Sequence, residues 1–214
     1  MRPRTYWRPA QGEPTVTLLL RHGQTPMSVQ KRYAGRSDVP LTDVGVQQAA
    51  AAAKRLASAD LGVIVTSPLL RAVQTAQEVA SVTGAAVVTD DGFRETDFGA
   101  WEGLTFAEVR ERWPSEVTTW LADPDVAPPG GESFTDVSTR VTAALHRVLA
   151  DRDGQRVLIV SHVTPIKTLV AAALLAPPAA LFRMHLDVAA LCEIDWYADG
   201  PAVLRSFNDT GHLS

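Results

Sequence analysis

The sequence predicts an α/β fold, a three-layer α/β/α sandwich in which a mostly parallel sheet lies between helices. Short apolar, β-branched runs alternate with amphipathic segments long enough to be helices. Alternation of strand and helix is typical of a parallel sheet that is covered on both faces. With 214 residues, 46% of them hydrophobic, the chain is long enough for one domain with a buried core.

Six strands are expected, and each is indicated by its own residues. Residues 16–20 and 156–161 are continuous apolar runs with polar flanks, the pattern of strands buried on both faces. The last two expected strands are joined by a turn at Asp199, Gly200 and Pro201, which predicts a hairpin at the edge of the sheet. The expected strands cover 16–20, 61–66, 86–89, 156–161, 188–196 and 203–207.

Helices are expected between these strands because capping residues precede runs of helix-forming residues. Thr42 is a suitable N-cap for an alanine-rich segment, and Ser67 followed by Pro68 suits the start of the next helix. Gly84 would end that helix in a left-handed conformation. The expected helices cover 42–57, 67–82, 105–113, 133–150 and 164–175.

The long segment between the third and fourth expected strands differs from the rest. Residues 92–131 contain a short helix with a capping-box pair, Thr105 and Glu108, and then a loop rich in proline and glycine. We expect this segment to be an insertion over one end of the sheet, within a single domain over 15–214. The proline-rich residues 1–14 are expected to be a linker or an extended arm.

Composition excludes several classes of protein. The 20 Lys and Arg against 24 Asp and Glu give a net charge of −4, unlike the strongly basic balance of a nucleic-acid-binding domain. The single cysteine, Cys192, excludes an internal disulfide framework and indicates a reducing compartment, so we expect a cytoplasmic protein. No apolar run reaches about 18 residues and the five histidines lack metal-binding spacing, so we expect no membrane span and no metal.

Charged residues follow the ends of the expected strands, where ligands bind in open parallel sheets. Arg21 and His22 follow the first strand and His162 the fourth, while Arg71 and Glu95 come after the second and third. Each residue alone would more often be structural, but two arginines and two histidines at one edge favour a phosphoryl group. Positive neighbours would keep His22 unprotonated for attack on phosphorus, and Glu95 would protonate the leaving group.

The chain also contains five motifs in one order: LLLRHGQT, TSPLLRAVQTA, FRETDFGAWEG, PPGGES and VLIVSHVTPIK. Together they resemble the histidine phosphatase superfamily, its phosphoglycerate mutase-like branch, over nearly the whole chain. The resemblance implies a phosphomonoesterase that uses a phosphohistidine and needs no metal or cofactor. It implies that His22 is the nucleophile and Glu95 the proton donor, and that the phosphoryl group is bound by Arg21, Arg71 and His162.

Further substrate contacts are expected at Gln24, Thr25, Ser28 and Val163, which stand at positions that the resemblance implies for phosphate contacts. Arg36 is expected to contact the leaving group. Many members of the superfamily have Asn where Ser28 stands and two glycines where Val163 and Thr164 stand. The aromatic residues of the insertion are expected to form its small core rather than a base-binding pocket, and they are Phe98, Trp101, Phe106, Trp113 and Trp120.

Within the superfamily the chain resembles α-ribazole phosphatase and the acid phosphatase domain of two-domain proteins that also contain a ribonuclease H domain. This implies hydrolysis of α-ribazole 5′-phosphate in cobalamin nucleotide-loop assembly, or a broader acid phosphatase activity, with a ribonuclease H domain upstream of residue 1. A phosphoglycerate-type phosphatase or mutase and an inactive phosphate-binding module are the alternatives. The expected partner is a small phosphate monoester, without nucleic acid or membrane, and a homodimer through the C-terminal edge strands is compatible with the sequence.

Overall fold

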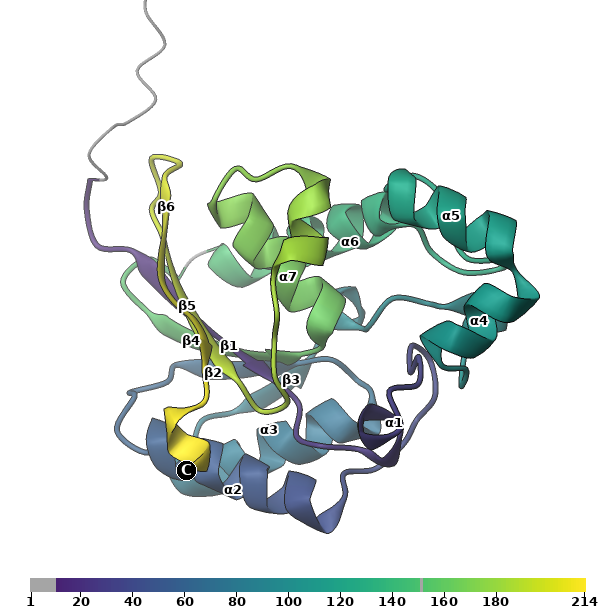
Figure 1. Ribbon diagram of the computed structural model, residues 1–214. Coiled ribbons are helices and arrows are strands. Elements are labelled where there is room, and N and C mark those ends of the chain that lie inside the picture. Colours follow the sequence, from purple (N-terminus) through teal and green to yellow (C-terminus); the bar gives the residue numbers. More distant parts are fainter. Residues whose placement is uncertain (1–10, 151) are drawn as a thin grey trace, which may run out of the picture.

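The computed structural model describes residues 11–150 and 152–214, which form one six-stranded sheet between helices (Figure 1). The strands are β1 (Thr15–Arg21), β2 (Val63–Thr66), β3 (Val87–Thr89), β4 (Arg156–Ser161), β5 (Leu191–Trp196) and β6 (Ala202–Asp209). Their order is β3-β2-β4-β1-β5-β6, with the first four parallel and β5 and β6 antiparallel to their neighbours. The expected α/β sandwich with a mostly parallel sheet and a C-terminal hairpin is confirmed.

Helices cover both faces of this sheet. They are α1 (Pro26–Val29), α2 (Asp43–Leu56), α3 (Leu70–Thr83), α4 (Phe106–Arg112), α5 (Pro114–Ala122), α6 (Phe134–Leu149) and α7 (Val163–Ala173). In Figure 1, α2 and α3 lie on one face and α6 and α7 on the other. Successive side chains of a strand point to opposite faces, so Leu18 and Leu20 join the core under α2 and α3, while Leu19 joins the core under α6 and α7.

Most of the expected helix boundaries are confirmed to within two residues, with their caps. The Thr42 hydroxyl accepts a hydrogen bond from the Gly45 amide at the start of α2. Thr105 and Glu108 form the capping box of α4, and Gly84 ends α3 with a φ of 73°. The short 3-10 helices were not expected, and they are Asp91–Phe93, Gly99–Trp101, Pro178–Arg183 and Gly211–Leu213.

The prediction that Ser67 caps α3 is wrong. The helix begins at Leu70, and its N-cap is Leu69, whose side chain makes no capping hydrogen bond. The Ser67 hydroxyl instead lies 2.7 Å from Nε2 of His162. The Ser67 hydroxyl, which its position in the sequence suggested as a helix cap, is therefore hydrogen-bonded to a buried histidine far away in the chain.

The segment 92–131 contains two helices, although only one was expected. Pro114, which directly follows the expected helix, stands in the first turn of α5, a position that proline favours. Phe98, Trp101 and Trp120 are buried in a small core of this segment, as expected, whereas Phe106 is 41% exposed. This core continues into Phe134 of α6, so the segment is packed against the main body.

The expected linker over 1–14 lies mostly outside the described residues, and 11–14 precede β1 without forming a helix or strand. Of the helices in the described ranges, none is both long and apolar enough to cross a membrane.

Candidate active site

Two histidines emerge side by side from the centre of the sheet. The parallel register pairs Arg21 at the end of β1 with Ser161 at the end of β4, so the residues that follow them are neighbours. The ring centroids of His22 and His162 are 5.1 Å apart, and both side chains are buried. The sheet topology thus brings together two residues that are far apart in the chain.

The hydrogen bonds of His22 determine which of its ring nitrogens is free. Its Nδ1 lies 2.7 Å from the carbonyl oxygen of Gly23. A carbonyl can only accept, so we assign the proton to Nδ1 and the lone pair to Nε2. Burial, followed by the charges of Arg71 and Arg21, holds the pKa of His22 well below its usual value. The ring is therefore neutral and presents a nucleophilic nitrogen.

Two arginines beside the histidines are held by backbone oxygens. The Arg71 guanidinium is almost fully buried and donates to the carbonyls of Ala34 and Ser37, each at 2.7 Å. Arg21 donates to the carbonyl of Leu186 at 2.6 Å. Burial lowers the pKa of Arg21 to about 10, which still leaves it charged at neutral pH. Within the described residues, Nε of each arginine is buried without a hydrogen-bond partner.

Glu95, in the loop after β3, lines the same cavity as His22. Its carboxylate accepts hydrogen bonds from the amides of Val163 at 3.0 Å and Thr164 at 3.3 Å, at the N-terminus of α7. Arg140 of α6 holds this loop, because it donates to the Glu95 carbonyl at 2.9 Å and pairs with Glu132 at 2.8 Å. Sequence reasoning missed Arg140, since an arginine within a helix usually faces solvent.

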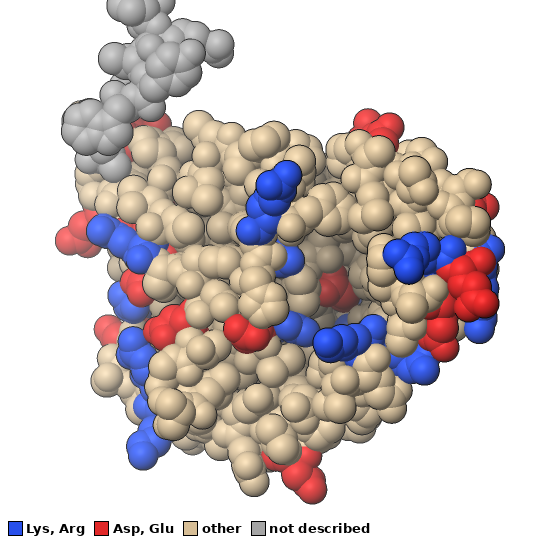
Figure 2. All heavy atoms as spheres, in the orientation of Figure 1, with Lys and Arg blue, Asp and Glu red and all other residues tan. Residues whose placement is uncertain are grey.

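A cavity of about 270 Å³ opens over His22. Basic side chains lie around a hollow on this side of the molecule in Figure 2, beside the part that carries α4 and α5. One wall of the cavity is aromatic and consists of Tyr33, Phe98, Trp120 and Phe134. Phe98 and Trp120 were expected only in the core of the insertion, but they also face this cavity. The lining residues are Arg21, His22, Thr25, Ser28, Arg32, Tyr33, Ala34, Glu95, Phe98, Trp120, Phe134, Val163 and Thr164.

The expected substrate contacts divide into two groups. Thr25, Ser28 and Val163 line the cavity. Gln24 does not, because its side chain accepts a hydrogen bond from the Thr42 hydroxyl at 2.9 Å. Arg36 does not either, since it is 74% exposed and pairs with Asp97 at 2.8 Å. The structure therefore brings three of the five expected contacts to the cavity.

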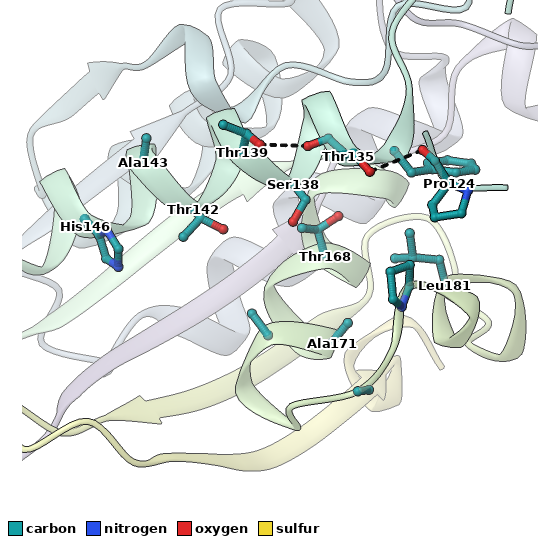
Figure 3. Close-up of a pocket in the computed structure, with 14 residues that line it drawn as sticks. Pro124, Thr135, Ser138, Thr139, Thr142, Ala143, His146, Thr168, Ala171 and Leu181 are labelled. Atoms are coloured by element: carbon teal, nitrogen blue, oxygen red, sulfur yellow. Dashed lines mark hydrogen bonds between the residues drawn. The ribbon is translucent and has the colours of Figure 1, made fainter. Parts of the chain in front are cut away.

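A larger cavity, of about 640 Å³, lies between α6 and α7 (Figure 3). Among the residues that the structure describes, its lining contains hydroxyl, alanine and proline side chains and His146, but no Arg, Lys, Asp or Glu. Phe134 is the only lining residue that it shares with the cavity over His22. The described lining of this larger cavity has no arginine or lysine side chain to bind a phosphoryl group. The smaller cavity over His22 is therefore the better candidate for the active site.

Comparison with known proteins gives the family. The model of the histidine phosphatase superfamily (branch 1) matches residues 17–210. The chain is 50% identical over 208 residues to the bifunctional protein Rv2228c of Mycobacterium tuberculosis, covering 97% of this chain and 57% of that protein. It thus spans little more than half of this relative's length. It is 35% identical over 204 residues to "Probable phosphoglycerate mutase GpmB" of Proteus mirabilis, covering 92% of this chain and 94% of that one.

Solved structures agree with this family. Mycobacterial glucosyl-3-phosphoglycerate phosphatase Rv2419c superposes with a TM-score of 0.82 at 32% identity, covering 92% of this chain and 99% of that chain. A protein of Escherichia coli str. K-12 assigned as an α-ribazole-5′-P phosphatase gives a TM-score of 0.84 at 27% identity, covering 92% and 97%. The chain belongs to the histidine phosphatase superfamily (branch 1).

Proposed function

We propose that this chain is a phosphatase that hydrolyses phosphate monoesters through a phosphohistidine on His22. The observation that carries the proposal is the state of that ring. Its Nδ1 proton is engaged by the Gly23 carbonyl, and its pKa is lowered, so Nε2 is a free base beside Arg21 and Arg71. Fixed cations next to a neutral nucleophile suit attack on a phosphoryl group, because they stabilise the charge that develops on its oxygens.

The reaction has two displacements. Nε2 of His22 attacks phosphorus, the N–P bond forms, and the bond to the leaving oxygen breaks as a protonated Glu95 delivers its proton to that oxygen. The Glu95 carboxylate then takes a proton from water, the resulting hydroxide attacks phosphorus, and the N–P bond breaks to release phosphate. Arg21, Arg71 and His162 bind the phosphoryl oxygens in both steps, so the protein itself supplies the positive charge and no metal is needed.

The hydrogen bonds of Glu95 suggest how its carboxyl group moves to the leaving oxygen of a bound substrate. The amides of Val163 and Thr164, which it now engages, form a helix N-terminus of the kind that binds phosphate. A phosphoryl group beside His22 would compete for the same amides. Its binding would therefore release the carboxyl group toward the leaving oxygen.

The aromatic wall supports a planar, uncharged leaving group. Tyr33, Phe98, Trp120 and Phe134 line the cavity, and stacking on such side chains suits an aromatic base. Arg32, the cation on this side, already pairs with Glu108 at 2.9 Å, so it is poorly placed for a substrate carboxylate. We therefore take α-ribazole 5′-phosphate as the leading substrate, ahead of phosphoglycerate-type acids, and the likeness to the E. coli protein supports this choice.

The test is kcat/KM for α-ribazole 5′-phosphate, 3-phosphoglycerate and p-nitrophenyl phosphate, each with EDTA present. We expect turnover in EDTA and a clear preference for α-ribazole 5′-phosphate. Similar low values for all three would support a broader acid phosphatase. A preference for 3-phosphoglycerate would contradict the role of the aromatic wall, and loss of all activity in EDTA would contradict the metal-independent reaction.

A further inference from the structure

Ser67 directly follows the neighbouring strand β2 and contacts His162, the second histidine of the site. The parallel register of β2 and β4 pairs Thr66 with Val160, so Ser67 lies beside the end of β4. Its amide donates to the Val160 carbonyl at 3.0 Å, which fixes its backbone there. The side chain is fully buried, and Oγ lies 2.7 Å from Nε2 of His162.

The direction of this hydrogen bond follows from the other contacts of the hydroxyl. Ser67 Oγ already accepts a hydrogen bond from the Leu69 amide at 3.3 Å. If His162 Nε2 also donated to it, the hydroxyl proton would be buried with no acceptor among the described residues. If Ser67 donates to Nε2, the hydroxyl has both a donor and an acceptor as partners. Buried polar groups are almost always paired, so the second arrangement is favoured.

This direction determines the state of the whole His162 ring. Nε2 then carries the lone pair, and in a neutral ring the proton is on Nδ1. Burial, followed by the charge of Arg71, holds the pKa of His162 well below its usual value, so the ring is neutral. Its Nδ1 is buried and has no hydrogen-bond partner within the described ranges. It is a donor that lacks an acceptor in a ring 5.1 Å from that of His22.

The two rings therefore share one tautomer but have opposite uses. The proton of His22 is engaged by a carbonyl, and its lone pair remains for attack. The lone pair of His162 is engaged by a hydroxyl, and its proton remains for a phosphoryl oxygen. We propose that Ser67 is a positioning residue that holds neutral His162 in the Nδ1–H tautomer, as a hydrogen-bond donor to the phosphoryl group. The use of this proton rests on the proposed phosphatase reaction, but the tautomer does not.

The tautomer can be read directly by long-range ¹H–¹⁵N NMR of the ¹⁵N-labelled chain at neutral pH, with the His162 signals identified by their loss in His162→Gln. We expect a protonated Nδ1 and a pyridine-like Nε2 in the unmodified protein. Ser67→Ala should remove this preference. Ser161→Ala is the matched control, because Ser161 is equally buried and its hydroxyl donates to the Phe93 carbonyl at 2.7 Å. It should leave the tautomer unchanged.

Two further measurements connect the tautomer to the reaction. Inorganic phosphate should shift the Nδ1 proton signal of His162 in the unmodified protein. Ser67→Ala should lower kcat by about tenfold, the effect of losing one well-placed hydrogen bond, and Ser67→Thr, which keeps the hydroxyl, should restore most of it.

The outcomes separate this inference from the proposed function. A proton on Nε2 of His162, or a cationic ring, in the unmodified protein would overturn the role of Ser67, even if Ser67→Ala fails to fold. An Nδ1 signal that phosphate does not move would overturn the donor role. An Nδ1–H tautomer in a chain that hydrolyses no phosphate ester would leave Ser67 as the residue that sets the tautomer and would refute the phosphatase reaction alone.

Discussion

The phosphoryl side and the leaving-group side of the candidate site are built from different parts of the chain. On the phosphoryl side, His22 and His162 follow the central strands, and hydrogen bonds to the Gly23 carbonyl and the Ser67 hydroxyl hold their rings. On the leaving-group side the contacts are between aromatic rings, and Trp120 packs edge-on against Trp101 with 5.3 Å between centroids. Hydrogen bonds fix atoms to a few tenths of an ångström, whereas ring packing fixes mainly shape.

This difference implies that chemistry and selectivity are separable in this protein. Changes on the phosphoryl side should reduce turnover of every substrate. Changes on the leaving-group side should alter the ranking of substrates and leave the reaction itself intact.

The largest effect is expected from His22→Ala, which removes the attacking nitrogen. We expect kcat to fall by at least about 10⁴-fold for every phosphate ester, since the other histidine of the site, His162, has its lone pair engaged by Ser67 and is not free to form an N–P bond. Steady-state kinetics with α-ribazole 5′-phosphate and p-nitrophenyl phosphate would measure it, with circular dichroism as the control for folding. Activity within tenfold of the unmodified protein would refute the phosphohistidine.

A smaller and substrate-dependent loss is expected from Glu95→Gln, which keeps the shape of the side chain but cannot donate a carboxylic proton. Turnover of α-ribazole 5′-phosphate should fall about 10²- to 10⁴-fold, the usual range for a general acid. Formation of the phosphohistidine from p-nitrophenyl phosphate should fall less, because p-nitrophenolate leaves without a proton. Single-turnover kinetics would compare the two, and equal losses would contradict the role of Glu95 as proton donor.

On the other side of the site, Trp120→Leu tests selectivity. We expect kcat/KM for α-ribazole 5′-phosphate to fall about fivefold, because one stacked ring contributes roughly 1 kcal/mol beyond its buried area. Ethyl phosphate, whose leaving group does not reach the aromatic wall, should be unaffected. Phe106→Leu is the control, since Phe106 is 41% exposed and does not line the cavity. Equal losses for both esters would refute the separation of the two sides.

Stability should depend on pH through the phosphoryl side. The pKa values of His22 and His162 are lowered well below 6.5 in the folded protein, so below pH 6.5 the unfolded chain binds more protons. As far as these two histidines are concerned, the free energy of unfolding is highest above pH 6.5. It falls as the pH drops toward the folded pKa values, by up to about 1.4 kcal/mol per pH unit for each histidine. Urea unfolding should show a shallower fall in His162→Gln, and an identical slope would contradict the neutral ring.

The smallest effect is expected from Arg36→Ala. This side chain is 74% exposed and its partner Asp97 lies outside the cavity over His22, so kcat/KM should change by less than about twofold. A tenfold loss with α-ribazole 5′-phosphate would mean that Arg36 moves to the substrate, and it would extend the leaving-group side beyond the aromatic wall.

The sequence by itself determined the sheet and the edge at which the charged residues meet. Apolar runs, capping residues and the alternation of strand and helix are local signals. They placed the ends of the two central strands at Leu20 and Ser161, within one residue of the observed ends. The carboxyl ends of parallel strands share one edge of a sheet, so the strand pattern alone places His22 and His162 at the same edge. That they are neighbours there depends on the strand order, which puts β4 beside β1.

Only the tertiary structure decided which partner each polar side chain takes. The position of Ser67 in the sequence predicted a helix cap, but its hydroxyl forms a hydrogen bond with a histidine 95 positions away in the chain. Arg140 has a position typical of an exposed helix surface, but it holds the Glu95 loop. Arg36 pairs with Asp97 and does not line the cavity over His22. Hydroxyl, guanidinium and carboxylate groups bond whatever group the packed core brings within reach, and local sequence does not contain that distance.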